Sequence, residues 1–410
     1  MRARAHLAAA AVAALVLALV LAPASVAAPP AIHAPEAILV EPATNDVVVD
    51  RDADDERPIA STTKLMTALL TLEHARLSRT MTAVRYHPLP AESVIGLRAG
   101  ERLTVADLLR GLVLASANDA AATLATRIGG TERRFVSMMN RRARRLGLHH
   151  THYANPIGLD QAGNYSSAAD LVKLTLMLRR DRFFRQTANL PQTTLQSGAH
   201  PRAIVNRNVL VRTVPEVNGV KTGHTIDAGY VLVGSATHRG VNVVSVVLGE
   251  PSEAARDADS LALLRYGLRR YHRVKPVRRG QVFASVPLAH RSSRTDLVAA
   301  ASVTRTARRG EHIATRVLDV PAEIDGPLPA GTRVGTIEVR WRGRAVARVP
   351  LVTRAPIAAA SLWERADDLL GRTLTVAVLA LVALASLQLV LLRRRAVRRR
   401  RREAGPTGVA

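Results

Sequence analysis

Ser61 and Lys64 form a Ser-x-x-Lys pattern, which pairs a nucleophile with a base. Residues at positions i and i+3 share one face of a helix, so a helix that begins after Pro58 holds the Lys64 amine beside the Ser61 hydroxyl. A serine hydroxyl is a weak nucleophile until a neighbouring base accepts its proton, and a buried lysine with a lowered pKa can be that base. At a helix N-terminus, backbone N–H groups can also stabilise a developing oxyanion. The pattern therefore predicts covalent catalysis by Ser61.

Two further short patterns suit the same chemistry. Ser116 and Asn118 can point into one cleft from a short loop, where Ser116 would relay a proton to a leaving group and Asn118 would hold a peptide carbonyl. Lys221-Thr222-Gly223 is expected to open a strand. Its glycine lets a substrate backbone approach, its threonine hydroxyl can bind a carboxylate, and its lysine adds positive potential. Taken alone, the first pattern is more often a helix cap and the second a strand edge with a stray lysine.

Lysine is rare in this chain, which adds weight to two of these positions. Only four of the 58 basic residues are lysines, and Lys64 and Lys221 are two of the four. A desolvated lysine can lose its proton, whereas an arginine in practice cannot. We therefore expect lysine to persist where chemistry requires it. The chain has no cysteine, which excludes disulfides, thiolate metal sites and a cysteine nucleophile.

The three patterns in this order are the active-site set of penicillin-binding proteins and serine β-lactamases, which the chain resembles. The surrounding sequence is most similar to the low-molecular-mass D,D-carboxypeptidases of the penicillin-binding type 5 group, peptidase family S11. The resemblance covers residues 37–267 well and residues 271–356 loosely. It rests on the segments 59–67, 116–121, 147–167, 220–225 and 228–230.

This resemblance implies a serine-type D-alanyl-D-alanine carboxypeptidase that trims peptidoglycan stem peptides and is acylated by β-lactam antibiotics. Ser61 would be acylated by the penultimate D-alanine carbonyl, Lys64 would act as general base, and Ser116 would assist as described. The backbone N–H groups of Ser61 and His224 would form the oxyanion hole. The resemblance implies these substrate-binding residues: Asn118, Lys221, Thr222, Gly223, His224, Arg256 and Arg207.

The sequence departs from the group at two points. Ala117 stands in the middle pattern where relatives often have glycine, and the chain ends in a predicted spanning helix rather than the amphipathic terminal helix common in the group. Neither departure touches the proposed chemistry. No metal or cofactor is expected, and His149, His150 and His152 are interpreted as helix-end histidines rather than metal ligands.

The predicted fold is an α/β (α+β) serine β-lactamase/transpeptidase-like catalytic domain, followed by a small all-β domain and one C-terminal transmembrane helix. Helical spacing runs through residues 61–77, 104–128 and 132–146, and adjacent strands are predicted at 230–234 and 241–248. Later β-prone runs lie at 282–286, 333–339 and 344–352. The predicted boundaries are a signal peptide at 1–28, the catalytic domain at 29–270, the β-rich domain at 271–356, a linker at 357–372, the transmembrane helix at 373–392 and an arginine-rich tail at 393–410.

The two ends predict export and a single membrane crossing. Residues 1–28 combine arginines, an apolar run and small residues, as a secretory signal does. Residues 373–392 are uncharged and long enough to span the hydrocarbon core as a helix. Because arginines follow at once, the positive-inside rule makes the tail cytoplasmic and the body extracytoplasmic. We therefore expect a single-pass protein of the cell membrane.

The net charge of +25 predicts association with polyanions. The topology favours anionic lipids or wall polymers over nucleic acid. Three alternatives to the carboxypeptidase remain open from the sequence: a D,D-endopeptidase or a β-lactamase that uses the same site, or a catalytically silent scaffold that binds wall polymer. The sequence does not set the oligomeric state.

Overall fold

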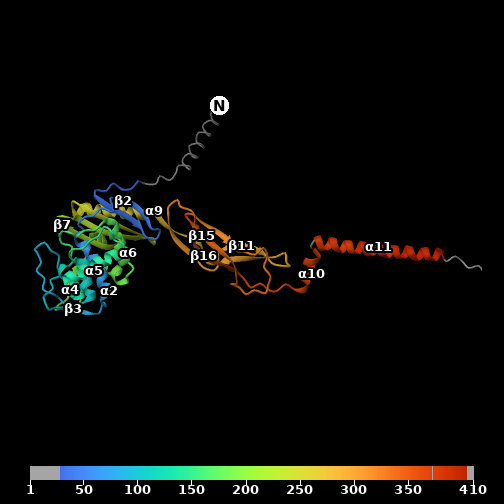
Figure 1. Ribbon diagram of the computed structural model, residues 1–410, viewed down its shortest axis with the longest axis horizontal. Coiled ribbons are helices and arrows are strands. Elements are labelled where there is room, and N and C mark those ends of the chain that lie inside the picture. Colours follow the sequence, from blue (N-terminus) through green and yellow to red (C-terminus); the bar gives the residue numbers. More distant parts are fainter. Residues whose placement is uncertain (1–27, 372, 404–410) are drawn as a thin grey trace, which may run out of the picture. The chain divides into compact units, whose positions relative to one another are not determined.

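The structure is a computed structural model that describes residues 28–371 and 373–403, and Figure 1 shows its elements. The predicted signal segment lies outside the described residues except for Ala28. The chain divides into two compact units. The first runs to Arg273 and takes in Thr306–Arg309, and the second takes in Val274–Arg305 and the chain from Gly310 onward.

A five-stranded antiparallel sheet forms the centre of the first unit, in the order β2-β1-β9-β8-β7. Side chains alternate between the two faces of a strand. On β1, Ile38 and Val40 join the core on one face, whereas Ala37 and Leu39 join the core on the other. Both faces are covered, so the central strands are apolar along most of their length. The strands are β1 (Glu36–Glu41), β2 (Asp46–Arg51), β7 (Val217–Thr225), β8 (Gly229–His238) and β9 (Val241–Glu250).

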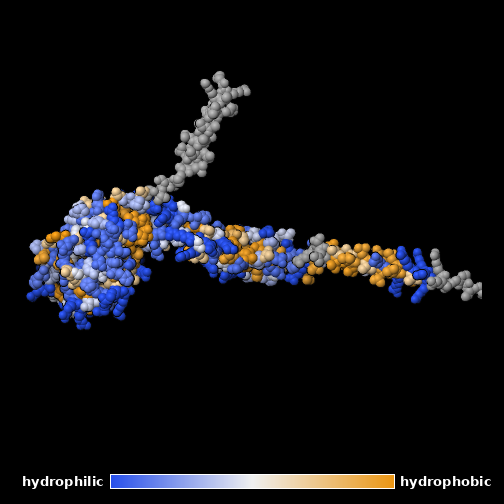
Figure 2. Space-filling model, turned by 45° about the horizontal axis from the view of Figure 1, so that its top comes forward, coloured by the Kyte–Doolittle hydropathy of each residue, from blue (hydrophilic) through white to orange (hydrophobic). Residues whose placement is uncertain are grey.

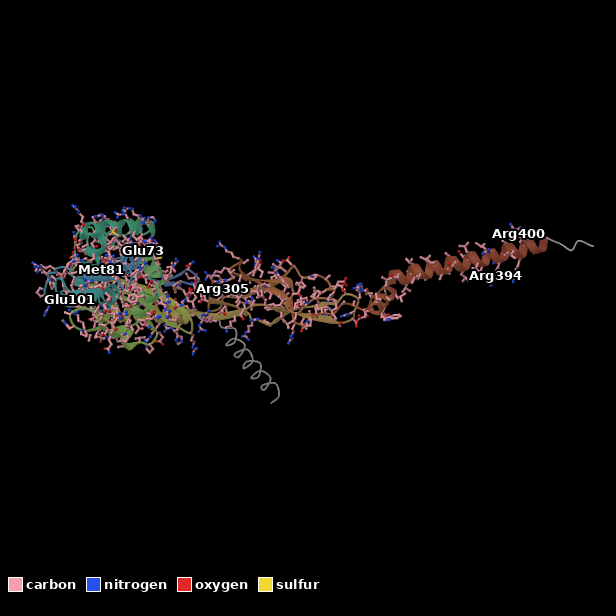
Figure 3. All side chains as sticks on the ribbon, turned by 90° about the horizontal axis from the view of Figure 1, so that it is seen from below. Glu73, Met81, Glu101, Arg305, Arg394 and Arg400 are labelled. Atoms are coloured by element: carbon pink, nitrogen blue, oxygen red, sulfur yellow. The ribbon has the colours of Figure 1, made fainter. Side chains whose placement is uncertain are left out.

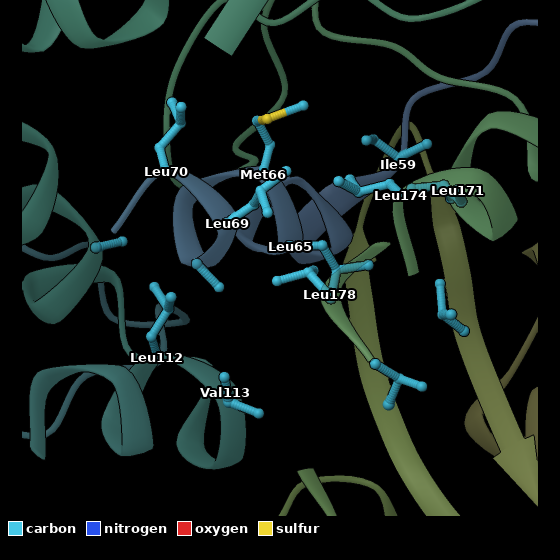
Figure 4. Close-up of a cluster of buried hydrophobic side chains, with 14 of the residues drawn as sticks. Ile59, Leu65, Met66, Leu69, Leu70, Leu112, Val113, Leu171, Leu174 and Leu178 are labelled. Carbon is cyan, nitrogen blue, oxygen red and sulfur yellow. The ribbon is translucent and has the colours of Figure 1, made fainter. Parts of the chain in front are cut away.

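Helices on one side of the sheet form the larger core, with α2 (Lys64–His74) among them. The first eight residues of α2 are buried, as a helix surrounded by other elements requires. Figure 4 shows its leucines and Met66 among side chains of η2 (Gly111–Ala115) and α6 (Ala168–Leu178). The remaining elements of this unit are η1 (Ala60–Thr63), α3 (Val105–Arg110), α4 (Asn118–Gly129), α5 (Glu132–Arg145), α7 (Arg182–Ala188), α8 (Val209–Thr213) and the hairpins β3 (Thr80–Thr82) with β4 (Arg102–Thr104) and β5 (Gln192–Leu195) with β6 (Arg202–Val205).

The segment 104–128 differs from the single helical pattern that the sequence predicts. It forms α3, one π-helical segment and α4, with a break at Ser116. Ser116 has a left-handed backbone (φ 60°), and the Ala117 N–H donates to Gly111 O at 3.1 Å. The apolar residues on both sides continue the same pattern, so periodicity does not reveal the break. A second difference is that Lys221 lies within β7, four residues after its start, rather than opening the strand.

The second unit contains another five-stranded antiparallel sheet, in the order β11-β12-β16-β15-β14. Its core is separate from those of the first unit and includes Leu297, Ile337 and Leu351. β10 (Tyr271–Val277) and β13 (Val303–Arg308) form a two-stranded sheet. The strands of the larger sheet are β11 (Val282–Pro287), β12 (Arg294–Ala299), β14 (Ile313–Leu318), β15 (Arg333–Trp341) and β16 (Arg344–Thr353).

Two helices end the described chain. α10 (Leu362–Gly371) occupies most of the predicted linker, and α11 (Thr373–Glu403) continues beyond the predicted span through the arginines. By length and composition, the described part of the chain has one helix that can cross a membrane, between Thr375 and Arg400. Figure 2 shows its apolar surface, and Figure 3 shows Arg394 and Arg400 near its C-terminal end.

α9 (Glu253–Arg270) covers the other face of the first sheet at short range. Small residues permit this approach. A Cβ atom on Gly267 would lie 2.9 Å from Val243 Cγ1 and 3.2 Å from Leu39 Cδ2. On the opposing strand, a Cβ atom on Gly234 would lie 2.7 Å from Ser260 Oγ. α9 can therefore lie close to the sheet because Gly267 and Gly234 have no side chains.

Gly267→Leu should lower the stability of the first unit by about 1–3 kcal/mol, because overpacking exceeds the roughly 1 kcal/mol that a helix gains on losing a glycine. Scanning calorimetry would measure this as a lower Tm. Ala258→Leu is the matched control, since Ala258 is exposed on the same helix. An unchanged Tm for Gly267→Leu would show that the helix can move away at no cost.

Candidate active site

Ser61 lies in the short η1 helix at the entrance to α2 and is half-buried. Two glycines let other segments reach it. A Cβ atom on Gly158 (φ +85°) would lie 2.0 Å from Ala60 O, and a Cβ atom on Gly223 would lie 2.9 Å from Ser61 N. Side chains at these positions would push the two backbones away. The loop before α6 and strand β7 therefore close around the backbone of Ser61.

Lys64 begins α2 and is 1% exposed. Its Nζ atom donates to Ser61 Oγ at 2.8 Å and to Ile157 O at 2.5 Å. Burial lowers the pKa of Lys64 to about 7, with the negative charge of Glu92 opposing this shift and the positive charge of Arg207 adding to it. A substantial fraction of Lys64 is therefore neutral near pH 7, and the neutral amine can accept a proton from Ser61.

A second serine–lysine pair faces the same site. Lys221 Nζ donates to Ser116 Oγ at 2.8 Å and to Thr222 O at 2.7 Å. Burial lowers the pKa of Lys221 well below its ordinary value, and the positive charges of Lys64, Arg207 and Arg256 lower it further. The left-handed backbone at Ser116 separates the π-helical segment from α4 and leaves the hydroxyl in contact with Lys221. The second and third predicted motifs thus meet through a direct hydrogen bond.

Asn118 is the first residue of α4 and is 4% exposed. It does not cap the helix with its side chain, which was the alternative reading of this pattern. Its Nδ2 donates to Glu92 Oε2 at 2.7 Å, while its Oδ1 is buried without a partner among the described residues. The amide is therefore held by one end, and its oxygen and second N–H remain for a substrate peptide.

Glu92 is a residue of this site that the sequence did not indicate. It accepts hydrogen bonds from Tyr86 Oη, Asn118 Nδ2 and, at 3.1 Å, Leu89 N. Partial burial alone would raise the pKa of Glu92. These hydrogen bonds and the positive charge of Lys64 outweigh burial and hold the pKa of Glu92 below its ordinary value. The residue lies in an irregular loop with no recognisable motif. Only its contacts in space identify it.

Asp119 fixes this loop against α4. Its carboxylate accepts from Leu97 N at 2.9 Å and Ile95 N at 3.2 Å, and the neighbouring Asn118 N–H donates to Ser93 O at 2.7 Å. Asp119 is itself buried. The start of α4 therefore positions both Asn118 and the loop that carries its carboxylate partner.

The predicted residues of β7 and α9 form the next part of the site. Thr222 and Gly223 are buried in β7, whereas His224 is exposed. The His224 ring stacks on Tyr230 of the adjacent strand at 4.0 Å between ring centroids. Arg256 lies 6.0 Å from that tyrosine ring, and its guanidinium pairs with Glu253 and Asp257 at 2.8 Å. Arg256 therefore influences the site in two ways. It lies against the Tyr230 ring, and its positive charge lowers the pKa of Lys221.

Arg207 has the opposite character. Its backbone N–H donates to Leu114 O at 3.0 Å, which ties it to the turn before Ser116. Its side chain is exposed and forms no ion pair with another described residue. It lines a cavity of about 710 Å³ together with Ala115 and Arg212. An unpaired guanidinium at this position can bind a substrate carboxylate.

Comparison with known proteins shows the family of this chain. Residues 23–252 match the D-alanyl-D-alanine carboxypeptidase family, peptidase S11. D-alanyl-D-alanine carboxypeptidase DacA of Escherichia coli is 32% identical over 83% of this chain and 87% of its own length. DacF of Bacillus subtilis is 28% identical over 78% and 85%, respectively.

Solved structures are similar in the same way. Penicillin-binding protein 5 of Haemophilus influenzae aligns with a TM-score of 0.59 and 27% identity, covering 81% of this chain and 99% of that protein. The Streptomyces K15 DD-transpeptidase aligns with a TM-score of 0.56 and 31% identity, covering 59% and 100%. The predicted fold class is confirmed, with the further β domain and the apolar C-terminal helix present. The chain belongs to the D-alanyl-D-alanine carboxypeptidase family, peptidase S11, and is a serine carboxypeptidase of the penicillin-binding protein 5 type.

Proposed function

We propose that this carboxypeptidase removes the terminal D-alanine of peptidoglycan pentapeptide stems through an ester on Ser61, with Lys64 as the general base. The observation that carries the proposal is the 2.8 Å contact between Lys64 Nζ and Ser61 Oγ, at a lysine whose pKa is lowered to about 7. Family membership favours this reaction over the endopeptidase, β-lactamase and silent-scaffold alternatives.

The reaction begins when neutral Lys64 accepts the Ser61 proton and Ser61 Oγ attacks the carbonyl carbon of the penultimate D-alanine. The backbone N–H groups of Ser61 and His224 stabilise the resulting oxyanion. The amide C–N bond then breaks. Ser116 relays a proton to the leaving D-alanine nitrogen, held in position by its 2.8 Å hydrogen bond from Lys221. Water then attacks the ester carbonyl carbon, the bond between that carbon and Ser61 Oγ breaks, Ser61 takes back a proton, and the shortened peptide leaves as a carboxylate.

Substrate binding uses the groups around this centre. The terminal carboxylate meets the positive field of Arg207 and Lys221 and the hydroxyl of Thr222. The free N–H and oxygen of the Asn118 amide bind the stem peptide backbone, and Glu92 keeps that amide in one orientation. Gly223 leaves room for the substrate backbone beside β7. β-Lactams enter the same site as mimics of the D-Ala-D-Ala amide and remain as esters of Ser61.

We further propose the topology that the sequence predicts. α11 holds the protein in the cell membrane by a single crossing, with the catalytic unit outside and the arginines at the cytoplasmic end. The substrate is then an external wall polymer, which is consistent with a family that acts on peptidoglycan.

Fluorescent penicillin should label the purified full-length chain on Ser61. Proteolysis and mass spectrometry would locate the adduct. Ser61→Ala should abolish labelling, whereas Ser137→Ala, on α5, should retain it. An adduct on another residue, or none on folded protein, would contradict the assignment of the nucleophile.

The pH profile should report Lys64. Because the neutral amine is the reactive form, kcat/KM for a D-Ala-D-Ala peptide should fall as the pH drops through about 7. Lys64→Arg should lower kcat/KM by at least about 100-fold, since arginine keeps its proton. Rates measured from pH 5 to 9 on both proteins would test this. A wild-type rate that stays flat down to pH 5 would assign the base elsewhere.

Glu92→Gln should shift the acidic limb of that profile to lower pH, because the carboxylate charge raises the pKa of Lys64. The uncharged amide can still accept from Asn118, so KM should change less than it does in Glu92→Ala. Glu73→Gln is the control, since Glu73 lies on α2 and pairs with Arg142 rather than with the site. If the limb moves equally in both variants, Glu92 has no specific role in tuning Lys64.

A further inference from the structure

In the second unit, the short helix α10 separates apolar from charged side chains. Its apolar residues stand at the i, i+1, i+4, i+7 and i+8 positions, which form a single stripe along a helix. They are Leu362, Trp363, Ala366, Leu369 and Leu370. Charged side chains cover the opposite face, namely Glu364, Arg365, Asp367 and Asp368. The helix is therefore amphipathic.

The two faces of α10 have the reverse of the burial found in soluble proteins. A surface helix of a soluble protein turns its apolar stripe to the core and its charges to water. In α10, Leu362 is 84% exposed and Trp363 is 85% exposed, and the other two leucines of the stripe are more than half exposed. The residues that the protein partly covers are instead Glu364 and Asp368. The stripe is therefore built for an apolar environment that this chain does not itself supply.

Contacts with the loop between β11 and β12 explain this orientation. Arg291 Nε lies 3.0 Å from Glu364 Oε1, and His290 Nδ1 forms a hydrogen bond of 2.9 Å with Asp368 Oδ2. Arg291 also donates to the backbone carbonyl of Ala359, just before the helix. Because the charged face of α10 is fixed to its own unit, the apolar stripe faces outward.

The place of α10 in the chain indicates what covers the stripe. α11, which can cross a membrane by its length and composition, begins at Thr373, two residues after α10 ends at Gly371. A segment that adjoins a spanning helix meets the head-group region of the bilayer, where tryptophan is enriched. α10 carries three acidic residues and one arginine, so hydrophobic burial rather than charge would hold it there.

We propose that the apolar face of α10 lies in the interface of the bilayer that α11 crosses, while its charged face holds the β11–β12 loop beside that surface. α11 then keeps the chain in the membrane, and α10 restrains how the second unit stands on it. This inference rests on the proposed crossing by α11, and it does not depend on Ser61 or on the peptidase reaction. Protein that fails to float with lipid vesicles would refute the crossing itself, which is a separate result from those below.

Tryptophan fluorescence tests the placement directly, because the chain has two tryptophans, Trp341 on β15 and Trp363 on α10. The full-length Trp341→Phe variant is reconstituted into phosphatidylcholine vesicles with and without brominated phosphatidylcholine, which quenches tryptophan on contact. Bromine should remove more than about half of the Trp363 emission if this side chain lies in the interface. The matched control is Trp363→Phe, whose remaining tryptophan pairs with Arg344 at the end of β16 that is farther along the chain from α10. Its emission should stay unquenched.

Variants of the stripe test whether the apolar face causes this contact. In the same single-tryptophan background, Leu369→Gln with Leu370→Gln should remove most of the quenching. Leu89→Gln with Val282→Gln is the matched control, since both residues are exposed elsewhere, and it should leave the quenching unchanged. Circular dichroism checks that each variant is folded.

A second measurement places the β11–β12 loop. The chain has no cysteine, so Ser292→Cys carries a single fluorophore on the exposed loop. Ser302→Cys is the control beyond the other end of β12, on the order of 20 Å away, so energy transfer to acceptor-labelled lipid head groups should be at least about two-fold stronger from position 292. Equal or weaker transfer from position 292 would refute the contact between loop and bilayer.

Two results would overturn the interfacial placement. Trp363 that stays unquenched by bromine, on protein that floats with the vesicles, would show that the stripe does not lie in lipid. Unquenched emission that shifts to shorter wavelength as the protein density in the vesicles rises would mean that a second copy of the chain covers the stripe instead.

Discussion

The chemistry proposed for this protein depends on one lysine being kept out of water. Lys64 would be fully protonated at neutral pH on a surface helix, and burial brings its pKa to about 7. The fold supplies that burial through α2, whose first eight residues face the core, and through two glycines that let neighbouring backbones approach Ser61. The sheet, the surrounding helices and the loop before α6 all serve this environment. A change that admits water beside Lys64 would raise its pKa and leave Ser61 without a neutral base, even with every motif residue present.

Burial of one lysine also constrains the groups around it. Lys221 is buried nearby, and Arg207 and Arg256 add further positive charge. These charges disfavour the protonated forms of the two lysines and so lower their pKa values. Glu92 acts in the opposite direction on Lys64 while it orients Asn118. A substrate carboxylate brings a second negative charge, which would raise the pKa of both lysines when it binds. By itself, the site therefore has an excess of positive charge, which an anionic ligand would offset.

The sequence predicted much of this arrangement because short motifs constrain local geometry. Ser61 and Lys64 are one helical turn apart, and the paired strands β8 and β9 carry clear apolar runs. The π-helical break before Ser116 could not be predicted, because Leu112, Val113 and Leu114 continue the helical pattern of α3. Glu92 was missed for a different reason: its role comes from hydrogen bonds to residues in other segments, and an irregular loop leaves no periodic signal. The continuation of α11 through the tail arginines could not be predicted either, because arginine favours a helix about as well as leucine does.

An unpaired cation supports the functional argument at the active site. At the active site, Arg207 has no carboxylate partner among the described residues, which supports the proposal that it binds the carboxylate of the substrate. Arg202, by contrast, has its counter-charge within the chain, because it pairs with Glu101. Where a guanidinium is held in a cavity without one, the counter-charge is best sought in a ligand.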